Sequence, residues 1–149
     1  MGEPLTPAEV LAAVPHRPPF RFIDEILEVD ADHILAAYRF REDADFYRGH
    51  FPGNPITPGV LLLETMAQAG VVAHGIYLLG RAAMVGGGLT LFTNAVVEFT
   101  GLVHPGERVL VRGRRVVFRR RLLRSEVVIR REAGATVCRG TLAGMRVSA

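Results

Sequence analysis

Apolar and polar positions along the chain follow two different periods. Residues 59–79 form a segment of about twenty residues without proline that is apolar on nearly every side, which is typical of a helix buried on most faces. The dipeptide Thr57-Pro58 precedes this segment, and a capping residue followed by proline favours a helix start. The run 6–9, Thr-Pro-Ala-Glu, has the same start pattern, so we expect a short helix there that ends near Val14.

Shorter runs alternate between apolar and polar residues, as half-buried strands do, and turn residues separate them. We expect strands over residues 21–29, 33–41, 89–99, 108–118, 122–131 and 135–147. Residues 42–56 are expected to be a loop, and the glycines 86–88 a flexible turn or bulge. One long helix and about six strands joined mostly by short turns predict an α+β fold, with an antiparallel sheet curled around the helix. A doubly wound sheet would need several crossover helices.

The composition is that of a globular protein. The 149 residues favour one domain over 1–149, and 49% hydrophobic and 22% charged residues are ordinary values. The start of the chain has no positively charged, apolar leader, and no apolar run has the ~18 residues of a membrane span, so we expect no membrane insertion. The single cysteine, Cys138, excludes an intrachain disulfide framework, and a cytoplasmic protein is the simplest interpretation.

The charge is unevenly distributed along the chain. All 18 basic residues are arginine, the formal net charge is +3, and nine arginines lie within 112–131. A solvated sheet face would explain this cluster, and an acidic partner, phosphate or nucleic acid would be attracted by it. Only Phe118 interleaves these arginines and no known nucleic-acid motif is present, so we expect no nucleic-acid partner.

The segment 49–59, GHFPGNPITPG, places a histidine in a loop with three prolines and three glycines. Proline fixes the backbone and glycine permits unusual dihedral angles, so the loop is expected to be rigid and specifically shaped. A rigid loop can hold the imidazole of His50 in the fixed orientation that a general base needs. The alternative is a loop histidine that is bonded to a nearby carbonyl.

Glu64 interrupts the apolar helix segment near the end of its second turn. A buried carboxylate is unfavourable unless it is paired, and burial favours its protonated form, which suits a proton donor. Gln68 lies one turn on, on the same face, and could form a hydrogen bond with Glu64. The alternative is a glutamate at the helix edge that reaches into solvent. Gly59 lies in the first turn, where a backbone N–H has no intrahelical partner and can polarise a carbonyl oxygen.

An imidazole base, a backbone donor and a carboxylic acid in one segment suit proton abstraction next to a carbonyl, with protonation of a β leaving group. The stretch H-F-P-G-N-P-x-x-P-G-V-L-x-x-E-x-M-A-Q over 50–68 resembles the active-site segment of the 3-hydroxyacyl-[acyl-carrier-protein] dehydratases of fatty acid synthesis. The preceding PHRPPFRFID, residues 15–24, is similar to the N-terminal segment of the same family. The resemblance covers most of the chain.

The resemblance implies a hot-dog fold, a long central helix wrapped by an antiparallel sheet, in a homodimer or a trimer of dimers. It also implies composite sites, with His50 from one subunit and Glu64 from the other, and an acyl carrier protein as partner. In such a site the Gly59 N–H would polarise the thioester carbonyl of a (3R)-3-hydroxyacyl chain, His50 would remove the C2 proton and Glu64 would protonate the departing hydroxyl. The product would be a trans-2-enoyl thioester, without a cofactor or metal. The supporting residues would be Gln68, Phe51 and Pro58.

Three alternatives stay open. Glu64 fits the branch of the family that only dehydrates, whereas residues 97–107 and 138–147 are closer to the branch that also isomerises the double bond and typically has aspartate at that position. A hot-dog thioesterase would cleave the same thioester with a carboxylate and water. A non-catalytic module would only bind the acyl carrier. The acyl chain length would depend on tunnel residues around Phe20, Phe22 and 84–92.

The other histidines and the cysteine fit structural roles. We expect His16 to be structural and His74 to pack in the core or an interface, while His33 and His104 fall in turns near the surface. Cys138 has no candidate base in its sequence context, and no group of His, Asp and Glu has metal-site spacing. Several arginines would form a positive surface for the acidic carrier protein near the tunnel mouth: Arg112, Arg114, Arg119, Arg120, Arg121 and Arg124.

Overall fold

The computed structural model describes residues 2–82 and 88–147 of the chain. Its elements follow in the order α1 (Pro7–Ala13), β1 (Glu25–Val29), β2 (His33–Arg39), η1 (Asp45–Arg48), α2 (Gly59–Ala67), η2 (Gln68–Ala73), α3 (His74–Leu79), β3 (Leu89–Phe99), β4 (Arg108–Arg119), β5 (Leu122–Arg131) and β6 (Thr136–Val147). Here η1 is a 3-10 helix, and η2 is a π-helical segment within one continuous helix made of α2, η2 and α3. We call this the central helix.

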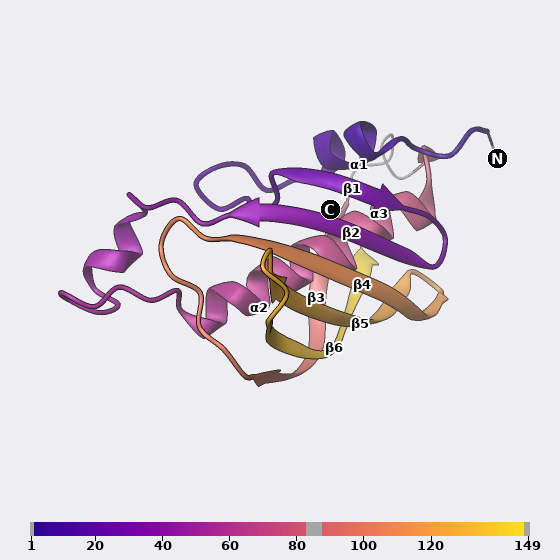
Figure 1. The fold of residues 1–149 in the computed structure, drawn as a ribbon. Coiled ribbons are helices and arrows are strands. Elements are labelled where there is room, and N and C mark those ends of the chain that lie inside the picture. The colour runs from indigo at the N-terminus through magenta and orange to yellow at the C-terminus, as the bar shows by residue number, and fades with distance from the viewer. Residues whose placement is uncertain (1, 83–87, 148–149) are drawn as a thin grey trace.

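All strand pairs are antiparallel and belong to one sheet, in the order β1-β2-β4-β5-β6-β3. The sheet curls around the central helix, and α1 lies beside β1 and α3 (Figure 1). This arrangement is the α+β, hot-dog fold predicted from the sequence. The sheet is uninterrupted from β1 to β3, and its concave face packs against the central helix.

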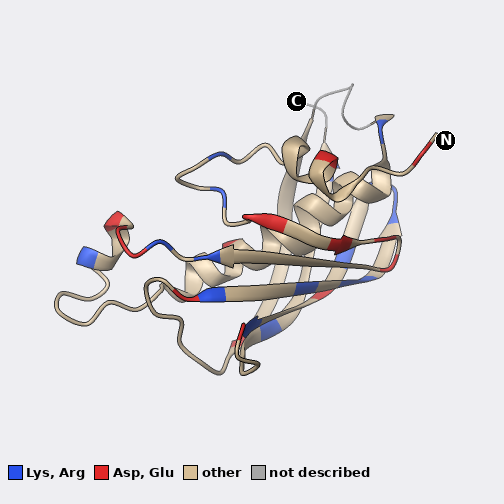
Figure 2. Ribbon diagram, turned by 45° about the horizontal axis from the view of Figure 1, so that its top comes forward, with Lys and Arg blue, Asp and Glu red and all other residues tan. Residues whose placement is uncertain are grey.

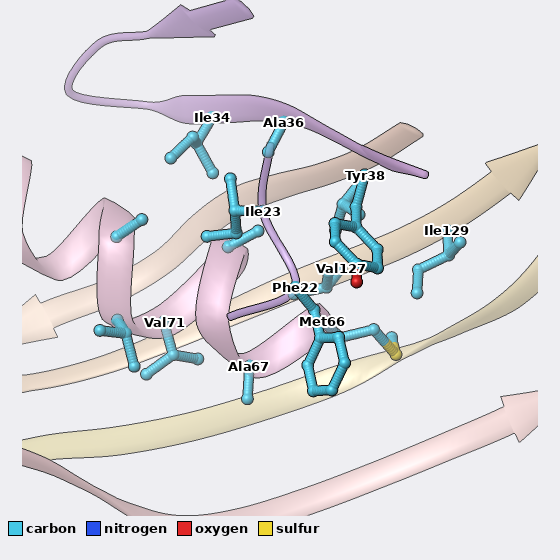
Figure 3. Packing of buried hydrophobic residues seen from close by; sticks show 14 of the residues in the cluster. Phe22, Ile23, Ile34, Ala36, Tyr38, Met66, Ala67, Val71, Val127 and Ile129 are labelled. Carbon is cyan, nitrogen blue, oxygen red and sulfur yellow. The ribbon is translucent and has the colours of Figure 1, made fainter. Parts of the chain in front are cut away.

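The core lies between the central helix and that concave face. Met66, Ala67 and Val71 of the helix belong to one buried cluster with side chains from the strands (Figure 3). The helix packs tightly against β5 at Gly70, where an added Cβ would lie 2.5 Å from Cγ2 of Val127. The hydroxyl of Ser125 donates to the Gly70 carbonyl at 3.0 Å, so the helix is also tied to β5 by a buried hydrogen bond.

One expectation, that no apolar run is long enough to span a membrane, is wrong for the central helix. Gly59–Leu79 has 21 residues and is long and apolar enough to cross a membrane by length and composition. A helix that is apolar on most sides belongs either in a protein core or in a membrane. Here 67% of its most apolar window is buried inside the protein, which makes it the core helix of the fold.

The first strand begins at Glu25, later than expected. Phe22 and Ile23 are both buried, so the alternation of a strand is absent there. The Phe22 N–H donates to the side chain of Gln68 at 2.8 Å and not to a neighbouring strand. Residues 15–24, which we call the connector, therefore pack onto the central helix before the sheet begins.

The two helix starts differ from each other. Thr6 and Glu9 form the expected capping box, in which each side chain accepts from the other residue's backbone N–H. Thr57 does not cap the central helix, because its hydroxyl lies 2.6 Å from the Tyr47 hydroxyl instead. Pro58 occupies the N-cap position without a side-chain hydrogen bond. The N-terminus of the central helix is therefore left without a side-chain cap.

The remaining bounds differ from the expectations by a few residues. β2 ends at Arg39, β6 begins at Thr136, and the predicted loop 42–56 contains η1. The turn or bulge expected at 86–88 falls mostly on residues 86 and 87, which lie outside the described residues.

Candidate active site

Glu64 projects from the second turn of the central helix, and its side chain is 23% exposed. Gln68, one turn on, donates from Nε2 to Oε2 of Glu64 at 2.8 Å, which is the hydrogen bond expected from their spacing. The carboxyl group is therefore partly buried and held by a defined donor, and it does not extend freely into solvent.

Gln68 is fully buried, and both ends of its amide have partners. Its Oε1 accepts from the Phe22 N–H at 2.8 Å, and its Nε2 donates to the Phe20 carbonyl at 2.9 Å as well as to Glu64. A backbone N–H can only donate and a carbonyl can only accept, so the orientation of the amide is determined. The connector thus fixes the donor that binds Glu64.

The connector also brings a histidine to this carboxylate. Nε2 of His16 lies 3.6 Å from Oε2 of Glu64, with the two side chains 25% and 23% exposed. The sequence alone assigned His16 a structural role and missed this contact, because the two residues are far apart in the chain. The similarity of residues 15–24 to the dehydratase segment was the feature that could have placed it here.

His50 is held within its own loop. Its Nδ1 lies 2.9 Å from the Ile56 carbonyl, and since a carbonyl only accepts, Nδ1 carries a proton. In the neutral ring Nε2 is then unprotonated, which is the tautomer that a general base needs. Backbone hydrogen bonds to Phe46 and from Ile56 brace the loop, and the ring stacks on Phe51 with centroids 4.1 Å apart. The bond to a carbonyl, expected under the alternative interpretation, is present, and it keeps a proton on Nδ1.

Gly59 is the first residue of α2, in the turn whose N–H groups lack intrahelical acceptors. The half-exposed ring of Phe99 lies against it, since a Cβ at Gly59 would be 3.4 Å from Cε1 of Phe99. Pro58 before it is buried, and Phe51 in the His50 loop is 48% exposed. The uncapped helix start and the His50 loop are thus joined through a short proline-containing segment.

These residues form two groups within one chain. Glu64, Gln68 and His16 lie together, whereas His50 contacts Ile56 and Phe51 in a loop that projects from the body of the molecule (Figure 1). In the described part of the chain, no hydrogen bond or ion pair joins His50 to Glu64. A single chain therefore does not bring the predicted base, His50, into contact with the predicted acid, Glu64.

Known proteins share the segments that carry both groups. The family model of the FabA-like domain matches residues 14–140, which include the connector, the His50 loop and Glu64. The chain belongs to the FabA-like domain family. Relatives of this FabA-like protein include the 3-hydroxyacyl-[acyl-carrier-protein] dehydratase FabZ of Thermus thermophilus, 37% identical over 113 residues, or 75% of this chain and 77% of that protein. The enzyme of the same name from Oenococcus oeni is 39% identical over 106 residues, or 69% of this chain and 72% of that protein.

Solved structures share the fold of this FabA-like chain. The dehydratase heterocomplex ApeI:P from Xenorhabdus doucetiae matches with a TM-score of 0.78 and 16% identity, over 97% of this chain and 93% of that one. The thioesterase HI1161 from Haemophilus influenzae matches with a TM-score of 0.70 and 16% identity, over 98% and 93%. At such identities the likeness shows the hot-dog fold alone, because proteins named for different reactions share it.

Two residues expected in packed positions are buried in the FabA-like fold. His74 donates from Nε2 to the Asp30 carbonyl at 2.8 Å, and burial lowers the pKa of its ring. Burial raises the pKa of the Cys138 thiol to about 11, and its sulfur lies 3.6 Å from Sδ of Met66. Within the described ranges, no group of three or more His, Cys, Asp and Glu residues could hold a metal ion.

His33 and His104 lie near the surface next to carboxylates. His33 is 2.8 Å from Glu28 and 3.0 Å from Asp30, and the hydrogen bond with Glu28 raises the pKa of His33. The side chain of His104 is 53% exposed and lies 3.2 Å from Glu107. Both histidines therefore have local partners away from His50 and Glu64.

The six arginines that we expected to form a positive surface lie on β4, β5 and the turn that joins them (Figure 2). Five are exposed and Arg124 is half-buried; the exposed ones are Arg112, Arg114, Arg119, Arg120 and Arg121. Glu126 forms an ion pair with Arg114 across the two strands, so part of the positive charge is compensated. What remains is a positive surface interrupted by carboxylates.

Proposed function

We propose that this protein dehydrates (3R)-3-hydroxyacyl-[acyl-carrier-protein] to trans-2-enoyl-[acyl-carrier-protein], as a single-domain cytoplasmic hydro-lyase of fatty acid biosynthesis or a related lipid or polyketide route. The observation that carries the proposal is the hydrogen bond from Nδ1 of His50 to the Ile56 carbonyl, which leaves Nε2 free to act as a base. Support comes from the relatives named 3-hydroxyacyl-[acyl-carrier-protein] dehydratase, at 37% and 39% identity.

The reaction divides between three groups. The N–H of Gly59, aided by the helix dipole, polarises the thioester carbonyl and makes the C2 proton more acidic. Nε2 of His50 accepts that proton, the C2–H electron pair forms the double bond, and the C3–O bond breaks. Glu64 gives its proton to the departing hydroxyl, which leaves as water. His50 is then protonated and Glu64 ionised, so one proton transfer between them restores both, and no electrons are gained or lost.

A second copy of the chain would complete the site. Among the described strands, β3 lies at the edge and pairs with β6 alone, and its exposed side chains include Leu91, Val96 and Phe99. Proteins pair or cover a long, exposed, apolar edge strand. Pairing along β3 in a homodimer would cover Phe99 beside Gly59 and would let the His50 loop of one copy reach Glu64 of the other. A trimer of such dimers is distinguished from a dimer by mass in solution.

The acyl carrier protein would approach the arginines of β4 and β5. Exposed ion pairs contribute only ~0.2–1 kcal/mol each, so the effect belongs to encounter rate and salt dependence. The double variant Arg112→Glu, Arg119→Glu should raise the KM for carrier-protein substrates and leave the turnover of a small thioester mimic nearly unchanged. Equal effects on both substrates, or none, would identify these arginines as an ordinary solvated face.

A product assay tests the proposed function. The protein is incubated with 3-hydroxyacyl thioesters of several chain lengths, and the conjugated enoyl product and free thiol are measured together. Enoyl product without thiol is expected. Thiol release would instead support the thioesterase alternative, and neither product would leave only a carrier-binding module.

The same assay distinguishes the two branches of the family. The carboxyl group of Glu64 reaches one methylene further than that of an aspartate, so it lies differently over C2 to C4 of the substrate. We therefore expect 2-enoyl product and little 3-enoyl product. Accumulation of a cis-3-decenoyl thioester from a ten-carbon substrate would assign the protein to the isomerising branch.

A further inference from the structure

Two donors approach one oxygen of Glu64. Nε2 of Gln68 lies 2.8 Å from Oε2, and Nε2 of His16 lies 3.6 Å from the same atom, slightly beyond a hydrogen bond. Hydrogen bonds in an empty active site are often long and shorten when the substrate binds. With both donors on Oε2, Oε1 is the oxygen that remains for a substrate.

The second ring nitrogen of His16 decides where its proton lies. Nδ1 is buried and has no hydrogen-bond partner among the described residues. Buried N–H groups without an acceptor are rarer in proteins than buried acceptors without a donor, so the proton belongs on Nε2. In the neutral ring the one N–H of His16 is therefore directed at Glu64.

The connector holds His16 in this position. The buried amide of Gln68 binds the Phe20 carbonyl and the Phe22 N–H, so the segment that follows His16 is fixed to the central helix. The same amide binds Glu64. One buried side chain thus sets the position of the acid and of the segment that carries the histidine.

We propose that His16 is a positioning residue for the acid, a role that rests on the dehydratase function proposed above. Gln68 donates to Oε2 of Glu64, and the N–H of His16, 3.6 Å from the same oxygen, comes within hydrogen-bond distance when the substrate binds, so the transferable proton resides on Oε1. When the C3–O bond breaks, that proton moves from Oε1 to the departing oxygen. The negative charge left on Glu64 is then stabilised by the N–H of Gln68 and by the N–H of His16 that has closed on the same oxygen.

Two substitutions separate this role from packing. His16→Gln puts an amide N–H where Nε2 of the ring lies, whereas His16→Asn reaches only the place of Nδ1. We expect His16→Asn to lower kcat about 10- to 100-fold with little change in KM, as for the loss of one hydrogen bond to a charged group, and His16→Gln to keep most of kcat. The matched control, His104→Gln at an exposed histidine, should change neither. Equal losses in the Gln and Asn variants would overturn the proposal.

A double-mutant cycle tests whether His16 acts through Glu64. Glu64→Asp withdraws the carboxyl group by about one methylene and so removes it from the reach of His16. The loss caused by His16→Asn should then shrink to about twofold or less in the Glu64→Asp background, because coupled residues are not additive. An unchanged loss in that background would assign His16 to packing alone.

A substrate-free measurement separates this inference from the proposed function. In protein with nitrogen-15-labelled histidine, Glu64→Gln should shift the ring nitrogen resonances of His16 and leave those of His104 in place. If the His16 resonances do not move, the positioning role is wrong even in an active dehydratase. If they move in a protein that dehydrates no hydroxyacyl thioester, the dehydratase function is wrong and the contact stands.

Discussion

At the residue scale, His50 and Glu64, the proposed base and acid, are each held by one neighbour. The Ile56 carbonyl, 2.9 Å away, keeps the proton of His50 on Nδ1, and Gln68 binds one oxygen of Glu64 at 2.8 Å. His50→Ala and Glu64→Gln should therefore each lower the dehydration rate about 10²–10⁴-fold, the range for a positioned acid or base. Steady-state rates on a hydroxyacyl thioester measure this. A folded variant with normal rates would remove its residue from the mechanism.

His74 gives the stability of the fold a dependence on pH. Burial lowers the pKa of its folded-state ring, so the unfolded chain binds the proton more readily. The stability contributed by the neutral ring is complete above the unfolded pKa of about 6.5 and is lost as the pH falls through that value toward the lower folded pKa. The groups that act on the ring are Asp30, His33 and Arg115.

The variant His74→Gln isolates this effect. Glutamine keeps an N–H for the Asp30 carbonyl but cannot take up a proton. The difference between the free energies of unfolding at pH 7 and pH 5, from urea denaturation, should be smaller in the variant than in the wild type. The raised pKa of His33 acts in the opposite sense, and the double variant His33→Gln, His74→Gln compared with His33→Gln removes its contribution. An equal difference in both proteins would show that His74 does not contribute.

At the scale of elements, the central helix packs tightly against the sheet at Gly70. A Cβ there would lie 2.5 Å from Cγ2 and 3.3 Å from Cγ1 of the buried Val127, whose short branched side chain has little freedom to move. Gly70→Ala should lower the free energy of unfolding by about 1–3 kcal/mol, the usual range for overpacking. Thermal or denaturant unfolding of the purified variant measures it.

Gly75 on the same helix provides the control. A Cβ at Gly75 would meet only Cδ2 of Leu123 at 3.9 Å, an ordinary contact. Gly75→Ala should be neutral or stabilising by up to about 1 kcal/mol, because alanine favours a helix over glycine. If the two alanine variants had the same stability, the close approach at Gly70 would not matter energetically.

At the scale of the whole molecule, His50 and Glu64 lie in separate parts of one chain, and the proposed dimer would bring them together. If His50 of one copy meets Glu64 of the other, a mixed dimer of His50→Ala and Glu64→Gln chains contains one intact site. Mixing the two inactive variants under subunit exchange should therefore restore part of the activity, at most about half of the wild-type value per dimer. No recovery after exchange, shown by mixed mass-labelled dimers, would place the two residues in one chain.

Local properties of the chain could be derived from the sequence alone. The period of apolar residues predicted the central helix and the strands, because periodicity reflects the local backbone geometry. The spacing of Glu64 and Gln68 predicted their hydrogen bond, since residues four apart share a helix face.

Contacts between distant segments were decided only by the tertiary structure. The strand expected from residue 21 begins at Glu25, because the buried amide of Gln68 takes the Phe22 N–H that a strand would have used. Thr57 does not cap the helix, because Tyr47 folds back onto its hydroxyl. His16 reaches Glu64 only because the connector packs across the central helix. Such pairings depend on how elements pack around the core, and no local spacing in the chain encodes them.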